Sequence, residues 1–428
     1  MTRFSKKSVS KPLRAGAAKL KITPSQPVPL AGFYVRQGPF KGVRDDLYAR
    51  AVVFESGGVE VAIVAVDTCV LPDGFCDDVI AHIAAAYPVV PDSIILNASH
   101  THSGPAVYVP PGLKDLNAFW LKEHPYIEEQ KRYTESLKEN IVRVVSEARD
   151  RMVPVRIGYG RGTSSIGVNR RALDERGNVA LGVNPQGPTD PELPVVRIDS
   201  ESGKTVAVMF NLGVHGTRMR TEQLTGDWCG IASQYCEDVW GGETVALFLS
   251  GASGDVNPMY EEAAAFNART GDAGKLAQMV GDEVIRVAES ITPGSGGPVR
   301  AVRRVVTVPG KRYLGLLGYD PACEELAEET TPVPDTPIRL SMVMVGDIVF
   351  AGASGEIFSE IGKEFKAKCT FPNAVFMGLC NGYTSYILSD AEMGRGGYEW
   401  NASVVREGGH EAVIAGLLGM AAGFHSTT

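Results

Sequence analysis

The sequence predicts an α/β protein with a mixed β-sheet core flanked by helices and an active site at the C-terminal ends of the strands. Short valine-rich apolar runs recur along the chain, and helical segments alternate with them. A strand, helix, strand unit near the N-terminus favours a right-handed crossover and a sheet covered by helices. Hydrophobic residues make up 44% of the 428 residues and charged residues 21%, as is usual for globular proteins.

The first strand, helix, strand unit lies between residues 59 and 99. The valine-rich run VEVAIVAVDT (59–68) is typical of a buried strand. The segment DGFCDDVIAHIAAAYP (73–88) has helical spacing and an acidic start, so it predicts a helix. The run SIILNAS (93–99) predicts the second strand. We expect His82, on the helix, to be a packed or surface residue.

The rest of the chain continues this alternation. Residues 133–151 predict an amphipathic helix, and VPVRIGYG (153–160) predicts the strand after it. Because only SESGK separates ELPVVRID (192–199) from TVAVMFNLGVHGT (205–217), these two runs predict a hairpin. The remaining predicted elements are strands in TVALFLS (244–250), VRAVRRVVTV (299–308), IRLSMVMVGDIVFAGAS (338–354) and AVFMGLC (374–380), and helices over about 271–290, from Glu356, and over 410–422.

Composition and charge argue against several classes of function. The formal net charge is −8 and the basic residues are dispersed, which argues against a nucleic-acid partner. No stretch is long enough to span a membrane, and the start MTRFSKKSVSKPLRAG lacks the apolar run of a signal peptide. The seven cysteines form no CxxC pair, which favours free thiols in a reducing compartment. We therefore expect a cytoplasmic protein.

Chemically active side chains follow five separate apolar runs. Each run ends in small residues, which let backbones crowd around a pocket while the strands hold the side chains in place. Two or three histidines with a carboxylate and an open position is the composition of a catalytic zinc site. The residues are His100 and His102 after IILNAS, His215 after VMFNLGV, Asp255 and Asn257 after ALFLSGAS, Glu356 after DIVFAGAS, and Tyr383 and Tyr386 after VFMGLCNG.

Each of these residues also has a structural interpretation. A lone histidine such as His215 is more often a hydrogen-bonded structural residue than a ligand. Asp255 in SGDVNP is typical of a turn, and Glu356 after GASG is typical of the first turn of a helix. The two tyrosines are equally consistent with core or rim positions. The recurrence at five strand ends favours a shared site, and an HxH pair on a strand places both imidazoles on one face.

An ordered set of motifs extends from about residue 20 to residue 400. It comprises KITPSQPVPLAGF, DDLYARAVVF, NASHTHSGP, VHGT, GDVNP, GASGEIFSEIG and NGYTSY followed by GGYE. This set resembles the neutral/alkaline ceramidases, zinc-dependent amidases that cleave the N-acyl bond of sphingoid lipids. The resemblance implies one Zn²⁺ per chain with the ligands His100, His215, Glu356 and Tyr386. It further implies that His102 lies beside the metal, that Arg170 steadies the substrate carbonyl, that Tyr398 is a second active-site tyrosine, and that Asp255 matches the aspartate of the family's GDVSPN element.

Two features depart from the family pattern. Asn257 replaces the serine of the GDVSPN element, and an amide cannot form an acyl intermediate, so we expect water to be the nucleophile. The family's C-terminal immunoglobulin-like domain has no counterpart here, so we expect a different lipid-handling surface. The expected organisation is a flexible arm over residues 1–20 and a single zinc-hydrolase catalytic domain over residues 21–428.

The predicted function is hydrolysis of an N-acyl amide bond by metal-activated water. The predicted substrate is a small molecule, a class that includes the lipids of sphingolipid metabolism. Either Asp255 or His102 is expected to take the proton of the water, and His102 to pass a proton to the leaving amine. Asn257 is expected to help position the substrate. The alternatives are a related zinc hydrolase of an ester, lactone or cyclic amide, and a non-catalytic zinc protein. Substrate choice depends on the loops over 103–130 and 311–335, and the sequence does not fix the oligomeric state.

Overall fold

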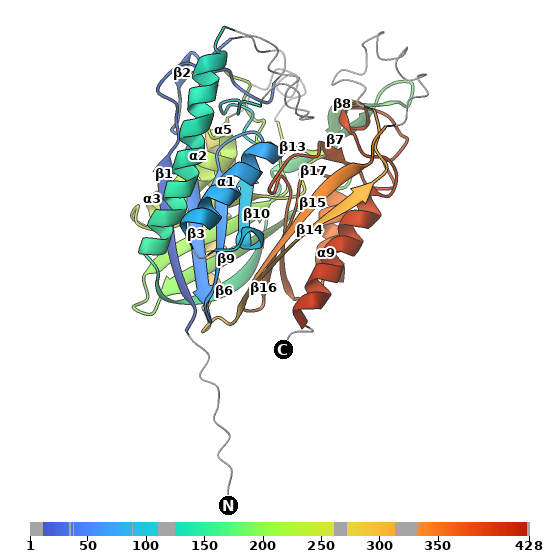
Figure 1. Ribbon diagram of the computed structural model, residues 1–428. Coiled ribbons are helices and arrows are strands. Elements are labelled where there is room, and N and C mark those ends of the chain that lie inside the picture. The colour runs from blue at the N-terminus through green and yellow to red at the C-terminus, as the bar shows by residue number, and fades with distance from the viewer. Residues whose placement is uncertain are drawn as a thin grey trace, which may run out of the picture.

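Two β-sheets pack against each other at the centre of the molecule (Figure 1). The computed structural model describes residues 12–33, 36, 38–87, 89–109, 125–260, 272–312 and 333–425. The larger sheet has the strand order β12 (Val245–Ser250), β10 (Thr205–Leu212), β9 (Glu192–Ser200), β6 (Val153–Thr163), β1 (Arg14–Lys21), β3 (Tyr48–Ser56), β4 (Val59–Val66) and β5 (Ile94–Ala98). The smaller sheet has the order β14 (Val299–Val308), β15 (Thr336–Val345), β16 (Ile348–Ala353) and β18 (Asn373–Met377).

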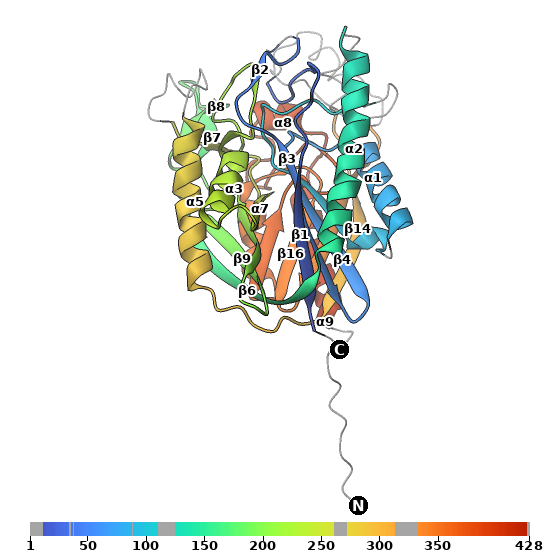
Figure 2. The same ribbon diagram turned by 90° about the vertical axis from the view of Figure 1, so that its left-hand side faces the viewer.

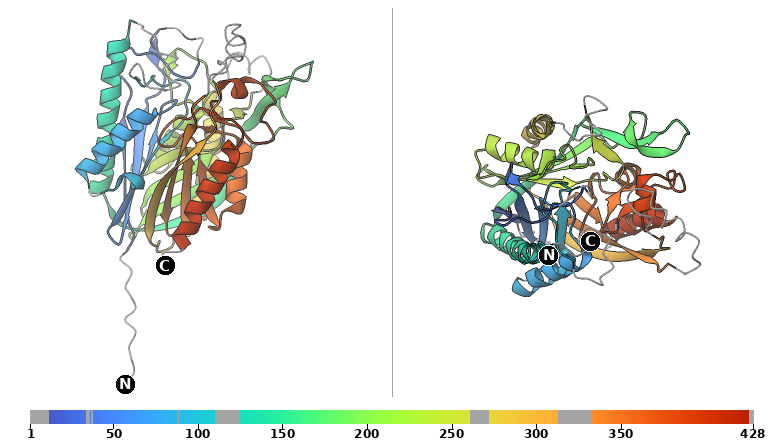
Figure 3. Two further views of the ribbon diagram at one scale, coloured as in Figure 1. Left: turned by 45° about the vertical axis from the view of Figure 1, so that its right-hand side comes forward. Right: turned by 90° about the horizontal axis from the view of Figure 1, so that it is seen from above.

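Helices cover the outer face of each sheet, which gives four layers (Figures 2 and 3). The apolar face of each helix packs on the sheet in one of three outer clusters. On the larger sheet these helices are α1 (Asp73–Ala86), α2 (Ile127–Asp150), α3 (Asp227–Val239) and α5 (Ala273–Ser290). On the smaller sheet they are α7 (Ser359–Lys368) and α9 (Gly409–His425). The predicted α/β class with a mixed sheet is confirmed.

The strand pairings explain why the sheets are mixed. Strands β4 and β5 are parallel and are joined through α1, as the first predicted unit requires, and β10 and β12 are parallel as well. The predicted hairpin of β9 and β10 is antiparallel. Short pairs complete the set: β2 (Gly42–Val43) with β11 (Gln223–Leu224), β7 (Gly167–Leu173) with β8 (Val179–Asn184) and β13 (Val256–Pro258), and β17 (Glu356–Ile357) with β19 (Tyr386–Ile387).

Two sequence-based expectations about element boundaries are wrong. The flexible arm was expected to reach residue 20, but residues 14–21 form β1 and pair with β3 and β6. The small residues there serve packing, because a Cβ at Gly16 would lie 2.1 Å from the carbonyl oxygen of Ala148 in α2. The expected helix from Glu356 begins at Ser359 instead, and Glu356 itself lies in β17. Residues 1–11 of the arm lie outside the described residues.

The interface between the sheets is a continuous apolar core. Phe54 and Ile63 of the larger sheet belong to the same buried cluster as Val343 and Phe350 of the smaller sheet. Within the described residues, no helix is both long enough and apolar enough to cross a bilayer.

Truncation of Phe350 at this interface is expected to be costly. Phe350 is fully buried, so Phe350→Ala removes buried apolar surface and leaves a cavity, which lowers the free energy of unfolding by about 3–5 kcal/mol. Denaturant unfolding followed by circular dichroism measures the change. The control is Val305→Ala, because Val305 on β14 is 62% exposed, and its effect is expected to stay within about 0.5 kcal/mol. Equal effects of the two variants would contradict the shared core.

Candidate metal centre

The loops that follow β5, β10 and β16 meet at one end of the two sheets. Thr101, just after β5, bridges to Gly216, just after β10. A Cβ at Gly216 would lie 2.7 Å from the carbonyl oxygen of His100, and one at Gly254 would lie 2.6 Å from that of Glu356. Only glycine permits these approaches. The small residues at the strand ends thus allow segments distant in sequence to bring their side chains together.

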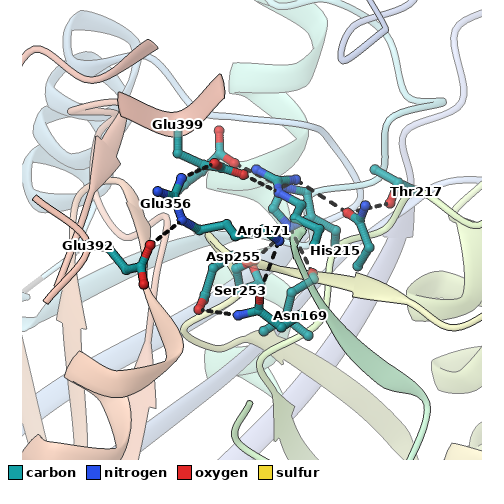
Figure 4. A network of polar contacts seen from close by, with 12 residues as sticks. Asn169, Arg171, His215, Thr217, Ser253, Asp255, Glu356, Glu392 and Glu399 are labelled. Carbon is teal, nitrogen blue, oxygen red and sulfur yellow. Dashed lines mark hydrogen bonds and ion pairs between the residues drawn. The ribbon is translucent and has the colours of Figure 1, made fainter. Parts of the chain in front are cut away.

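Three imidazoles and one carboxylate converge where these loops meet. Nε2 of His215 lies 3.0 Å from Oε2 of Glu356, and Nε2 of His100 lies 3.3 Å from the same oxygen. Nε2 of His102 lies 3.2 Å from Nε2 of His100. His100, His215 and Glu356 are buried, and their ligand atoms lie close enough to hold one metal ion. We refer to His100, His102, His215 and Glu356 as the metal cluster. Figure 4 shows His215, Glu356 and their neighbours.

The hydrogen bonds of two histidines direct lone pairs into the metal cluster. Nδ1 of His100 donates to the carbonyl of Cys69 at 2.8 Å, and Nδ1 of His215 donates to the carbonyl of Ser253 at 2.7 Å. In a neutral imidazole the other nitrogen, Nε2, then carries the lone pair. Such backbone bonds on the far nitrogen are typical of metal-ligating histidines. Imidazole nitrogens with a carboxylate form a donor set that fits zinc.

The electrostatics of the metal cluster also favour a positive charge. Burial lowers the pKa of His215 to about 3, and Arg170 adds to this effect. Burial also disfavours the charge on Glu356, but His100 and His215 outweigh it and hold the pKa of the carboxyl well below its ordinary value. The pKa of His100 rises to about 10, because the attraction of Glu356 outweighs burial. A positive charge is therefore stable here, either as a proton on His100 or as a metal ion on the same nitrogens.

The pairing of His100 with His102 has a different backbone cause from the one expected. Strand alternation was the expected reason for the pairing, but β5 ends at Ala98, so His100 lies past the strand as its predicted position implied, and His100 has φ of 63°. This left-handed conformation is uncommon outside glycine. Backbone bonds from His100 to Thr68 and from His102 to Gly216 hold it. A tight turn, rather than strand alternation, brings the two rings to 4.6 Å between centroids.

Two tyrosines from the loop after β18 approach the metal cluster differently. Tyr383 donates from Oη to Oε1 of Glu356 at 2.8 Å. Tyr386 pairs with Glu356 in the β17–β19 ladder, and its ring lies 5.7 Å from the ring of Tyr398. The role of Tyr386 as a metal ligand stays a prediction. Tyr383 was recognised from its strand-end position but received no role, and the structure shows that it positions the carboxylate.

Arg170 connects the metal cluster to a buried network of ion pairs (Figure 4). Its Nη1 lies 3.0 Å from Nε2 of His215, and its Nε donates to Glu399 at 2.7 Å. Its guanidinium also lies over the rings of Tyr386 and Tyr398. Arg170 and Tyr398 therefore lie together, and their roles toward the substrate stay predictions. The sequence reasoning missed Glu399, although an acidic residue directly after Tyr398 in GGYE was a usable signal.

Asp255 supports the site from behind. Its carboxylate accepts bonds from the backbone and hydroxyl of Ser359 at 2.7 and 3.0 Å and from Asn169 at 3.0 Å. Burial raises its pKa to about 7, against the bonds from Ser359. These contacts differ from the local turn bonds of the structural interpretation, because they tie the loop of Asp255 to the start of α7 and to β7. Proton transfer by Asp255 stays a prediction, and His102 is the better placed of the two candidates.

Cys69 is a further residue that the sequence reasoning missed. Its Sγ lies 3.8 Å from Nδ1 of His100, and it forms a potential ligand group with His100 and His102. The signal was the position of Cys69 just after the strand run VEVAIVAVDT. Of the loops expected to shape the pocket, residues 110–124 and 313–332 lie outside the described residues.

The fold and the site together define a class: an α/β protein with a buried histidine–carboxylate centre at the ends of its strands. A family model described as neutral/alkaline non-lysosomal ceramidase, N-terminal, matches residues 14–296. The chain belongs to the neutral/alkaline non-lysosomal ceramidase family.

The chain is also similar to curated relatives in sequence and to a solved structure in fold. The neutral ceramidase of Pseudomonas aeruginosa is 26% identical over 257 residues, 58% of this chain and 37% of that protein. Neutral ceramidase A of Dictyostelium discoideum is 26% identical over 227 residues, 49% of this chain and 30% of that protein. The matches thus span about a third of the length of these curated relatives. The crystal structure of the P. aeruginosa neutral ceramidase superposes with a TM-score of 0.77 at 20% identity and covers 97% of this chain and 75% of that chain.

Proposed function

We propose that this protein is a zinc-dependent amidohydrolase that cleaves an N-acyl bond by attack of water. The observation that carries the proposal is the convergence of His100, His215 and Glu356 on one buried point with both Nε2 lone pairs directed inward. A structural zinc site is usually closed by four protein ligands, whereas this buried group comprises three. Membership of the ceramidase family supports an amide as the bond that is cleaved.

The residues around the metal cluster supply what amide hydrolysis requires. Zinc, when bound, supplies Lewis acidity and makes water a competent nucleophile near neutral pH. Nη1 of Arg170 stands beside Nε2 of His215, so its guanidinium can stabilise negative charge on the carbonyl oxygen. Tyr386 and Tyr398 line the same side and offer phenolic donors. These groups are pre-oriented by the surrounding network, so little reorganisation is needed during the reaction.

His102 is the proposed carrier of the proton from water to the leaving amine. Its Nε2 faces His100 at the edge of the metal cluster, and its buried Nδ1 has no partner among the described residues. The ring is held by an edge contact with Phe33 at 5.0 Å between centroids. An imidazole in this position can accept a proton on one side of the scissile bond and deliver it on the other. The amide side chain of Asn257 cannot act as a general acid or base, so its proposed role is to position the substrate.

Removal of the metal is expected to abolish amide hydrolysis. Protein treated with a chelator should lose more than about 99% of its turnover of N-acyl substrates, since a catalytic metal contributes several kcal/mol, and one equivalent of Zn²⁺ should restore it. The assay uses ceramides and simpler N-acyl amines, with an ester of the same acyl chain as the comparison. Turnover that survives the chelator would contradict the proposal. Zinc binding without turnover of any substrate would favour a non-catalytic zinc protein, and turnover of the ester alone would favour the esterase alternative.

A further inference from the structure

Two buried hydrogen-bond donors beside the metal cluster have no partner among the described residues. They are Nη2 of Arg170 and Nδ2 of Asn257. Arg170 is 4% exposed and Asn257 is fully buried, so bulk water does not reach them freely. A buried donor left unsatisfied is costly, and native proteins seldom retain one without a reason. Two such donors in one site therefore indicate an acceptor that the substrate brings.

The orientation of the Asn257 amide is fixed by its acceptor end. Oδ1 of Asn257 accepts from Nη1 of Arg170 at 3.3 Å and from the hydroxyl of Thr217 at 3.5 Å. An amide has one acceptor and one donor end, so these contacts assign Oδ1 to the protein. Nδ2 is consequently the end that remains for a ligand.

The guanidinium of Arg170 is held in the same way. Glu399 accepts from its Nε at 2.7 Å, and Nη1 faces Asn257 and His215. The other oxygen of Glu399 accepts from Arg171 at 2.6 Å, so this carboxylate is divided between two cations. Of the guanidinium nitrogens, Nη2 of Arg170 is left without a partner in the part of the chain that the structure describes.

The two free donors belong to side chains that are in contact with each other. Nη2 shares the Cζ atom of Arg170 with Nη1, and Nδ2 shares the Cγ atom of Asn257 with Oδ1. Nη1 and Oδ1 lie 3.3 Å apart, so both free donors belong to one connected pair of side chains. One cationic and one neutral donor in this arrangement match an acceptor with two oxygens and a negative charge. The carbonyl oxygen of the scissile amide can engage the guanidinium, but it offers no second oxygen for the amide of Asn257.

We propose that Arg170 and Asn257 form a subsite for a carboxylate of the substrate, so that the enzyme prefers N-acyl compounds carrying a carboxylate next to the scissile amide. The inference rests on the proposed amidohydrolase function and names its substrate class. It makes Asn257 the residue that determines specificity, because its neutral donor completes the pair.

The test compares two substrates that differ only in the group proposed to bind Arg170 and Asn257. Zinc-loaded protein is assayed with N-decanoylglycine and with N-decanoylethanolamine, in which a hydroxymethyl group replaces the carboxylate. The ratio of kcat/KM is expected to favour the glycine compound by about 10- to 100-fold, the range for hydrogen bonds to a charged group. Asn257→Asp replaces Nδ2 by an anionic oxygen and should abolish or reverse this preference. The control Asn140→Asp adds the same charge on the exposed face of α2 and should leave the ratio unchanged.

The outcomes separate this inference from the proposed function. Equal kcat/KM values for the two substrates would overturn the carboxylate subsite and leave the amidohydrolase intact. If neither substrate is hydrolysed, the proposed function fails, and calorimetric titration of the zinc-loaded protein with N-decanoylglycine then decides the subsite. Binding that weakens at least tenfold in Asn257→Asp supports it, whereas absent binding or equal affinity overturns it. If circular dichroism shows that Asn257→Asp does not fold, Asn257→Ser, which removes Nδ2 without adding charge, takes its place in both measurements.

Discussion

His215→Ala is expected to abolish metal binding and activity together. His215 is fully buried and its Nε2 faces Glu356 at 3.0 Å, so the variant removes a ligand from the centre of the metal cluster. Zinc measured by elemental analysis should fall from one equivalent per chain to a small fraction, and kcat should fall on the order of 1000-fold, because several kcal/mol of metal-assisted stabilisation is lost.

A second histidine variant provides the control. His82 lies on the exposed side of α1, where its Nδ1 contacts the carbonyl and the carboxylate of Asp78 on the same helix. His82→Ala should retain one zinc per chain and full turnover. If His215→Ala also retained one zinc per chain, the metal cluster would not be the zinc site, whatever the activity of the variant.

Loss of Glu399 is expected to destabilise the folded protein strongly. Its two oxygens lie 2.7 Å from Nε of Arg170 and 2.6 Å from Nη1 of Arg171, and all three side chains are buried. Glu399→Ala leaves two guanidiniums without their shared partner, which should lower the free energy of unfolding by about 3–5 kcal/mol. Glu399→Gln retains hydrogen-bonding oxygen and should cost less. Urea denaturation followed by tryptophan fluorescence measures both.

The matched control for Glu399 is a partly exposed carboxylate. Glu364 on α7 pairs with Lys368 and His410 near the surface. Glu364→Ala should cost no more than about 1 kcal/mol. A Glu399→Ala variant as stable as Glu364→Ala would show that the two arginines find other partners, and Arg170 would then not depend on Glu399 for its orientation.

The strand periodicity and the strand-end chemistry were readable from the sequence. The runs before His100, His215 and Glu356 are the predicted strands β5, β10 and β16, and the three side chains meet as expected. These strands were predictable because buried strands appear in the sequence as continuous apolar runs, and small residues mark where the runs end. The convergence itself follows from the rule that ligands lie beyond the carboxyl ends of strands.

Other features depend on contacts between distant residues and were not readable. Strand β1 is rich in alanine and glycine because α2 packs closely on it, so it lacks the valine-rich pattern. The left-handed turn at His100 is stabilised by Thr68 and Gly216, which no local motif indicates. Glu399 acquires its role only because α8 (Tyr398–Ala402) lies against the arginines of β7.

The metal cluster draws on both halves of the sandwich. His100 and His215 follow strands of the eight-stranded sheet, whereas Glu356 and Tyr383 follow strands of the four-stranded sheet. An ion bound there would be coordinated by residues from both sheets, and the free energy of coordination would oppose separation of the two sheets. The stability of the two packed sheets and metal binding at the metal cluster are thus thermodynamically linked, because a ligand that binds only the folded state stabilises that state.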